Sequence, residues 1–123
     1  MKLQNLQNRM FIPETHAIGD SSELQQLMAE LVMSGPLSLE RVARHVGTSP
    51  RSLQRHLASR SLAFRSLVDT VRLQAASTLL RQTDLPAQEI AGRLGYSTPS
   101  NFSRAFVRWT GQTPRQFRQA IKS

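Results

Sequence analysis

Residues 87–106 read AQEIAGRLGYSTPSNFSRAF, and residues 39–57, LERVARHVGTSPRSLQRHL, follow the same plan. In each stretch a short apolar-faced segment containing alanine leads to a glycine, and a Ser-Pro or Thr-Pro pair then opens a second segment. Alanine lets two helices pack closely, and glycine permits the positive φ that a turn between helices needs. Ser or Thr followed by Pro is a typical helix start. Both stretches therefore predict a helix-turn-helix unit.

The two stretches match each other with one insertion. In the first half of each stretch, matching residues are 48 positions apart, for example Gly47 and Gly95. In the second half they are 49 positions apart, for example Arg55 and Arg104. One extra residue therefore lies in or just after the turn of the second unit. A single unit of this kind also describes an ordinary helical bundle, but two units in one chain favour a repeated DNA-binding element.

The rest of the chain is predicted to be helical as well. Apolar residues recur at helical spacing, and no stretch shows strand alternation bounded by turn residues. We therefore expect an all-α fold of about seven helices, with two helix-turn-helix subdomains joined by a long linker helix. The expected segments are a tail or interdomain linker at 1–20, a domain at 21–123 with a first helix at 21–34, helix-turn-helix units at about 38–59 and 86–111, the linker helix at about 63–82 and a final helix at about 114–122.

Charge indicates the kind of partner. The chain has 16 Lys+Arg and 8 Asp+Glu, a formal net charge of +8. Residues 41–123 hold 14 of the basic residues and three of the acidic ones, whereas residues 1–40 have a net charge of −3. All but two of the basic residues are arginine, whose planar fork can grip a phosphate or a guanine edge, although a high genomic GC content would also favour arginine. A small domain this basic is expected to bind a polyanion.

Other classes of function find little support in the sequence. The chain has no cysteine, which excludes disulfides and thiolate metal sites, and its three histidines lack the spacing of a metal motif. No glycine-rich phosphate loop follows a strand, so we expect neither an enzyme nor a cofactor. No apolar run approaches the roughly 18 residues of a membrane span, and no secretion signal is present, so a cytoplasmic, nucleoid-associated protein without a membrane partner is expected.

The sequence from about residue 38 to 118 resembles the DNA-binding domain of AraC/XylS-type transcriptional regulators. The resemblance rests on IAGRLGYSTPSNFSRAFVRWTGQTPRQFR at residues 90–118, on residues 39–57 and on VRLQAASTLL at residues 71–80. The family usually has glycine near position 61, where this chain has Ser61; we expect this departure to alter the turn into the linker helix without changing the fold.

The resemblance implies sequence-specific binding of double-stranded DNA and regulation of transcription, by activation through contact with RNA polymerase. Members often carry a separate effector-sensing domain, which we do not expect within this chain. We expect the DNA-binding domain to act as a monomer. A linker helix of roughly 20 residues is about 30 Å long, close to the ~34 Å repeat of B-DNA, so the two units could read adjacent major-groove segments.

The second helix of each unit is expected to face DNA. The apolar residues of this helix, which are expected to point into the core, are Leu53 and Leu57 in the first unit and Phe102 and Phe106 in the second. The opposite face of the helix is then available to contact DNA. On that face the resemblance places six base contacts: Arg51, Gln54, Arg55, Ser100, Asn101 and Arg104. Arginine suits guanine and glutamine suits adenine. Phosphate contacts are assigned to Ser49, Ser52, Ser97, Thr98 and Arg108.

Two other functions fit parts of the pattern. The acidic first 40 residues and the helix at 21–34 could belong to a helical protein-interaction module. A sequence-nonspecific architectural DNA binder is a further alternative, but outward Gln54 and Asn101 suit base edges better than phosphates.

Several further side chains carry open predictions. Arg72 lies three residues after Asp69, a spacing that predicts an intrahelical ion pair. The resemblance implies instead a structural role for Arg72 in the linker helix. Trp109 is predicted to lie in the core with the phenylalanines. Additional phosphate contacts could come from Arg41, Arg44, Arg93, Arg115 and Arg118.

Overall fold

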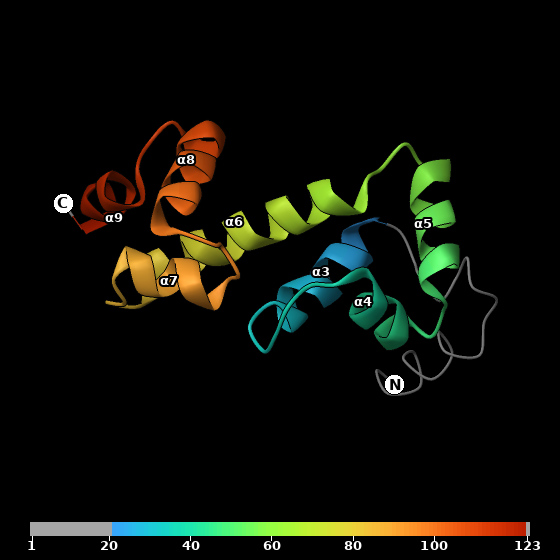
Figure 1. Cartoon of the computed structure of the whole chain (residues 1–123). Helices are drawn as coiled ribbons and strands as arrows, with labels where there is room; N and C mark the ends of the chain where they lie inside the picture. Colours follow the sequence, from blue (N-terminus) through green and yellow to red (C-terminus); the bar gives the residue numbers. More distant parts are fainter. Residues whose placement is uncertain (1–20, 123) are drawn as a thin grey trace, which may run out of the picture. The chain divides into compact units, whose positions relative to one another are not determined.

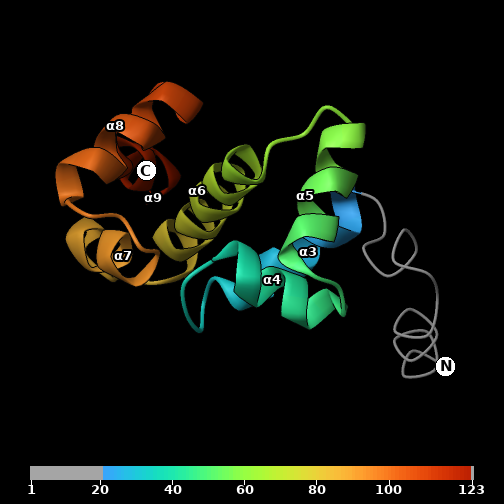
Figure 2. The same cartoon turned by 45° about the vertical axis from the view of Figure 1, so that its right-hand side comes forward.

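The computed structural model describes residues 21–122, which form seven α-helices and no strand, so the predicted all-α fold is confirmed. Figures 1 and 2 show the helices in two views. The predicted tail at residues 1–20 lies outside the described residues. The helices are α3 (Ser21–Leu31), α4 (Leu39–Val46), α5 (Pro50–Ser59), α6 (Phe64–Gln82), α7 (Ala87–Arg93), α8 (Pro99–Thr110) and α9 (Pro114–Lys122).

The chain divides into two compact units within α6: one ends at Val68 and the other begins at Asp69. In the first unit α4 packs against α5, and in the second α7 packs against α8 (Figure 1). Each unit therefore contains one helix-turn-helix pair and its own core. The buried residues of the first unit include Leu24, Met28, Leu31, Val32, Leu37, Val42, Ala43, Leu53 and Leu57.

Arg41 holds the end of α3 to the start of α4 in the first unit. Its guanidinium donates to the carbonyl oxygens of Leu31 and Pro36, each at 2.9 Å, and to the Ser34 hydroxyl at 2.9 Å. Carbonyls at the end of a helix have no partner within the helix, and Arg41 adds a charged donor to Leu31 O, which also accepts the Ser34 amide at 3.1 Å. This structural role competes with the suggested phosphate contact by Arg41.

The turn into α6 contains Ser61, at the position where regulators of the AraC/XylS type, which the sequence resembles, usually have glycine. Ser61 has φ +58, a left-handed conformation that glycine adopts without steric cost. The Ser61 amide donates to Ala58 O at 3.0 Å, and the Leu62 amide donates to Leu57 O at 2.9 Å, which closes the C-terminus of α5. Ser61 therefore adopts the conformation that glycine favours in this turn, and the all-α fold is kept.

Aromatic rings fill the core of the second unit. Phe102 and Phe106 are both fully buried. Their rings lie 5.7 Å apart between centroids, and Phe117 meets Phe106 at 5.2 Å, edge to face. The prediction that Trp109 lies in the core is wrong: its side chain is 45% exposed and touches Phe106 only at the rim of the cluster, at 6.0 Å.

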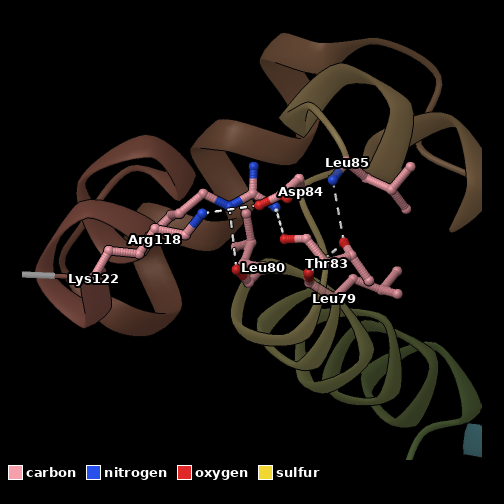
Figure 3. Close-up of polar contacts among 7 residues, drawn as sticks. All are labelled: Leu79, Leu80, Thr83, Asp84, Leu85, Arg118 and Lys122. Carbon is pink, nitrogen blue, oxygen red and sulfur yellow. Dashed lines mark hydrogen bonds and ion pairs between the residues drawn. The ribbon is translucent and has the colours of Figure 1, made fainter.

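Figure 3 shows how α9 is tied to the end of α6 in the second unit. The Arg118 guanidinium donates to Leu80 O at 3.1 Å and to Thr83 O at 3.0 Å. Beside it, the Lys122 ammonium pairs with the Asp84 carboxylate at 2.9 Å, and this contact holds the pKa of that carboxyl below its ordinary value. Arg118 thus satisfies one of the last carbonyls of the linker helix, Leu80 O, and the Thr83 carbonyl just beyond it, a role that competes with the suggested phosphate contact.

Arg118→Ala is expected to destabilise the second unit by about 2 kcal/mol, because two charge-assisted hydrogen bonds are lost and two carbonyls lose their partner. Arg118→Lys should restore only part of the loss, since one ammonium cannot reproduce the guanidinium fork. Urea unfolding followed by far-UV circular dichroism measures the effect. Lys122→Ala is the control: its ion pair is exposed and should contribute little. Equal losses for the two alanine variants would contradict this assignment.

Arg72 packs on the turn between α7 and α8. Its guanidinium carbon lies 5.4 Å from the centre of the Tyr96 ring, a cation–π contact. Gly95 sits beside it with φ +92, which favours glycine in this turn, and a Cβ there would approach the guanidinium to 3.1 Å, so a side chain at this position would also displace Arg72 slightly. Of the two predictions for Arg72, the structure supports the structural role rather than the ion pair with Asp69.

Tyr96 has a buried hydroxyl without a hydrogen-bond partner in the described part of the chain. Burial raises the pKa of Tyr96 above its ordinary value of 10.0. Well below pH 10.0 both the folded and the unfolded chain keep this hydroxyl neutral. Above that pH the unfolded chain ionises first, so the free energy of unfolding is expected to fall until the folded pKa is passed.

Tyr96→Phe is expected to remove this alkaline loss of stability and to raise the free energy of unfolding at neutral pH by about 1 kcal/mol, because a buried unpaired hydroxyl disappears. Urea midpoints at neutral and alkaline pH measure both effects. Tyr96 is the only tyrosine, so ultraviolet absorbance of the wild type reads its pKa directly. An ordinary pKa, or an equal alkaline loss in both proteins, would contradict the prediction.

Candidate nucleic-acid interface

The helices α5 and α8 begin in the same way. Ser49 caps α5 by accepting the Ser52 amide at 3.1 Å, and Thr98 caps α8 by accepting the Asn101 amide at 3.0 Å. In both helices proline occupies the first turn, where its missing N–H costs no hydrogen bond. The exposed N-terminus of each helix therefore presents hydroxyls and backbone N–H groups, the combination that holds phosphate at helix starts.

The turns before these helices also repeat. Gly47 and Gly95 both have positive φ, +81 and +92. The Thr48 amide donates to Ala43 O at 3.0 Å, and the Tyr96 amide makes the same bond to Ala91 O at 3.0 Å. The repeat thus keeps an offset of 48 through Tyr96.

The N-caps, however, stand at an offset of 49, Ser49 against Thr98. The predicted extra residue of the second unit is therefore Ser97, which follows the turn and precedes the cap. The first unit has no residue at the corresponding place.

The predicted base contacts of the first unit are all exposed on α5: Arg51, Gln54 and Arg55. Within residues 21–122 no hydrogen bond or ion pair engages any of these three side chains. Leu53 and Leu57, on the other side of the helix, are buried as predicted. Packing therefore anchors one face of α5 and leaves its polar face available to a ligand.

The predicted base contacts of the second unit, Ser100, Asn101 and Arg104, are also exposed, on α8. Two of them are linked: Arg104 Nη2 donates to Asn101 Oδ1 at 2.6 Å. Asn101 Nδ2 in turn donates to Ser97 Oγ at 2.6 Å. The polar face of α8 is thus an ordered network, whereas that of α5 consists of independent side chains.

The predicted phosphate contacts lie around the two helix starts. Ser49, Ser97, Thr98 and Arg108 are exposed, and Ser52 is half-buried. The hydroxyl oxygens of Ser49 and Thr98 accept hydrogen bonds from backbone amides of their helices. Their hydroxyl hydrogens remain available to donate to a phosphate oxygen. Of the other suggested arginines, Arg93 pairs with Glu89 at 3.2 Å, while Arg44 and Arg115 are exposed.

Counting from the N-caps shows one position that the sequence reasoning missed. Gln54 of α5 corresponds to Ser103 of α8, not to Asn101, which corresponds to Ser52. Ser103 lines a shallow hollow of about 350 Å³ together with Arg104, Val107 and Arg108. From the N-cap onward, matching residues of the two units are always 49 positions apart, and this constant spacing could have identified Ser103 as the counterpart of Gln54. The half-exposed Val107 adds an apolar contact surface of the kind that meets a thymine methyl group.

Within residues 21–122 no group of three or more His, Asp or Glu side chains is placed to hold a metal ion. None of the seven helices is both long and apolar enough to cross a bilayer.

Comparison with known proteins defines the class. A family model described as a helix-turn-helix domain matches residues 42–120. A solved AraC-type DNA-binding regulator from Chromobacterium violaceum has the same fold, with a TM-score of 0.67, 26% identity, and coverage of 82% of this chain and 91% of that one. The chain belongs to the AraC-type helix-turn-helix family of DNA-binding transcriptional regulators.

Two further proteins are similar to it. The ornithine utilization regulator of Pseudomonas aeruginosa is 46% identical over 82 residues, which cover 67% of this chain and 24% of that protein. The chain thus spans about a quarter of the length of this curated relative. The DNA-binding domain of AdpA, solved in complex with a target DNA, aligns with a TM-score of 0.64 and 26% identity over 83% of this chain and 92% of that one.

Proposed function

We propose that the chain binds double-stranded DNA in a sequence-specific manner, with α5 and α8 each entering a major groove. The observation that carries the proposal is the repeat itself. Two capped helices, each anchored by a buried apolar face, expose an arginine at the same place, Arg55 and Arg104. The DNA complex of the AdpA domain, which has this fold, supports the assignment of the ligand.

The chemistry of the exposed faces supports base reading. Arg51, Arg55 and Arg104 can each donate two parallel hydrogen bonds to guanine O6 and N7, and Gln54 can pair in the same way with adenine. Ser100 can donate to or accept from either groove edge, and Asn101 lies on the same surface. Phosphate contacts from Ser49, Ser52, Ser97, Thr98 and Arg108 would fix the register of each helix on the duplex.

The length of α6 supports the use of adjacent groove segments. Its 19 residues correspond to about 28 Å, close to the ~34 Å separation of successive major grooves. Two units in one chain would then present two recognition helices to DNA, as a dimer of single helix-turn-helix proteins does. We therefore propose that the domain acts as a monomer. We extend the proposal to transcriptional activation at the nucleoid through contact with RNA polymerase.

Arg104→Ala is expected to weaken binding to a preferred sequence by about 1–3 kcal/mol and to relax the preference at one base pair. The preferred sequence is obtained by selection from random DNA with the wild-type chain, and the dissociation constants follow from fluorescence anisotropy. Arg93→Ala is the control, because Arg93 is an exposed arginine of the preceding helix already paired with Glu89.

The outcome also separates two roles for Arg104. If the variant loses affinity for selected and random DNA by the same factor, Arg104 contacts phosphate. If the selection enriches no sequence at all, the proposed sequence-specific function fails.

A further inference from the structure

We propose that Asn101 is a positioning residue, which holds Arg104 ready to read DNA, and that the inserted Ser97 holds Asn101 in turn. This inference rests on the proposed function, because it assigns roles within the same DNA-reading surface. It differs from a direct base contact by Asn101, since Asn101 would act through Arg104.

The hydrogen bonds define the orientation of the Asn101 amide. Arg104 can only donate, so the atom that receives its Nη2 at 2.6 Å must be the amide oxygen. The amide nitrogen consequently faces Ser97 and donates to Ser97 Oγ at 2.6 Å. Three side chains, Ser97, Asn101 and Arg104, thus form one directed chain along the exposed start of α8.

This arrangement leaves Arg104 able to read a base and Asn101 poorly able to do so. Arg104 uses one of its five N–H groups on Asn101, and the others remain available for guanine O6 and N7. Reading adenine would need both the oxygen and the nitrogen of the Asn101 amide to face the base. One lone pair of the oxygen and one N–H of the nitrogen are already used, on Arg104 and Ser97. These two hydrogen bonds fix the direction of the remaining lone pair and N–H, so turning the amide to meet an adenine would break the chain of hydrogen bonds.

The first unit serves as a comparison within the same molecule. At the position of Asn101 it has Ser52, whose short side chain does not reach Arg55, and it lacks any counterpart of Ser97. Within the described residues Arg55 makes no hydrogen bond or ion pair. One insertion and one substitution between the units therefore fall on the two residues that hold Arg104.

A long side chain that is already ordered in the free protein binds more tightly, because it loses less conformational entropy when it meets DNA. For one arginine the gain corresponds to roughly three- to tenfold in the dissociation constant. The second unit is thus expected to read its base pair with an ordered arginine, and the first with a mobile one.

A double-mutant cycle on the selected DNA tests the inference. Asn101→Ala is expected to raise the dissociation constant by about three- to tenfold and to relax the same base preference as Arg104→Ala. In the Arg104→Ala background the Asn101 substitution should have no further effect. Asn101→Ser, which installs the residue of the first unit, should behave like Asn101→Ala. Ser97→Ala should give a loss of which only a part depends on Arg104, because the Ser97 hydroxyl is also proposed to contact phosphate. Independent, additive losses would show that Asn101 reads DNA itself and would overturn the inference.

A measurement on the free chain separates this inference from the proposed function. Nitrogen-15 relaxation of the arginine side chains should show Arg104 Nε more ordered than Arg55 Nε, and Asn101→Ala should remove the difference. Ser52→Ala is the matched control and should leave Arg55 unchanged. If the two arginines are equally mobile in the wild type, the inference fails even when DNA is bound specifically. If selection yields no preferred sequence, the proposed function fails, and the role of Asn101 in reading DNA fails with it.

Discussion

Phe106→Ala is expected to lower the free energy of unfolding of the second unit by about 3–5 kcal/mol. The Phe106 ring is fully buried and lies within 6.0 Å, between centroids, of the rings of Phe102, Trp109 and Phe117. Its removal leaves a cavity at the point where α8 and α9 meet, and rings on several sides cannot all move to fill it. A loss of this size is comparable to the whole stability of a small domain.

The effect is measured by urea unfolding followed by far-UV circular dichroism. Trp109 fluorescence is unsuitable as the sole probe, because the only tryptophan of the chain touches the substituted ring. Val107→Ala is the control: Val107 is the next residue of α8 but is 39% exposed, and its truncation should change stability by at most about 0.5 kcal/mol. A loss below about 1 kcal/mol for Phe106→Ala would mean that the aromatic cluster does not hold the second unit together.

The helices could be predicted from the sequence because their ends depend on local signals. Ser49 before Pro50 starts α5, and Gly47 with positive φ ends α4, whatever the rest of the chain does. The inward face of α8 was equally predictable, since Phe102 and Phe106 are one turn apart and both are buried.

The contacts of several arginines could not be predicted, because their partners are distant in sequence. Arg118 of α9 meets Leu80 and Thr83, 38 and 35 residues away, and Arg72 of α6 meets Tyr96 in the turn between α7 and α8. From sequence spacing alone, these side chains were expected to lie at the surface or to pair with a neighbouring carboxylate. Trp109 was misplaced for a related reason: helical periodicity put it on the apolar face, but it lies near the end of α8, at the edge of the aromatic cluster.

The candidate site was predictable as a set of residues but not as a network. The six predicted base contacts are all exposed on α5 and α8. The hydrogen bonds from Arg104 to Asn101 and from Asn101 to Ser97 depend on rotamers, and on the place of the inserted residue, which the alignment of the two units left open between the turn and the cap.

Affinity for DNA is expected to fall about 10³-fold between 50 and 200 mM salt, because binding phosphates releases the counterions condensed on the duplex. Not every basic residue should contribute. Arg41 and Arg118 cap carbonyls, and Lys122 is paired with Asp84. The exposed arginines whose side chains make no hydrogen bond or ion pair within residues 21–122 are Arg44, Arg51, Arg55, Arg60, Arg65, Arg108 and Arg115. Arg51 and Arg55 are proposed to read bases, so about five arginines are left to meet phosphates, and the slope of log affinity against log salt is then about −4.5.

Single charge removals test this division between free and engaged cations. Arg108→Gln should reduce the steepness of the salt dependence by about one, because one phosphate contact disappears. Lys122→Gln removes the same charge from a side chain that is already paired, and should leave the slope unchanged. Anisotropy titrations over 50–200 mM potassium chloride on selected and random DNA measure both. A wild-type slope shallower than about −2 would leave too few phosphate contacts for two helices in the groove, and equal changes in both variants would show that net charge alone, not the placement of the free arginines, governs binding.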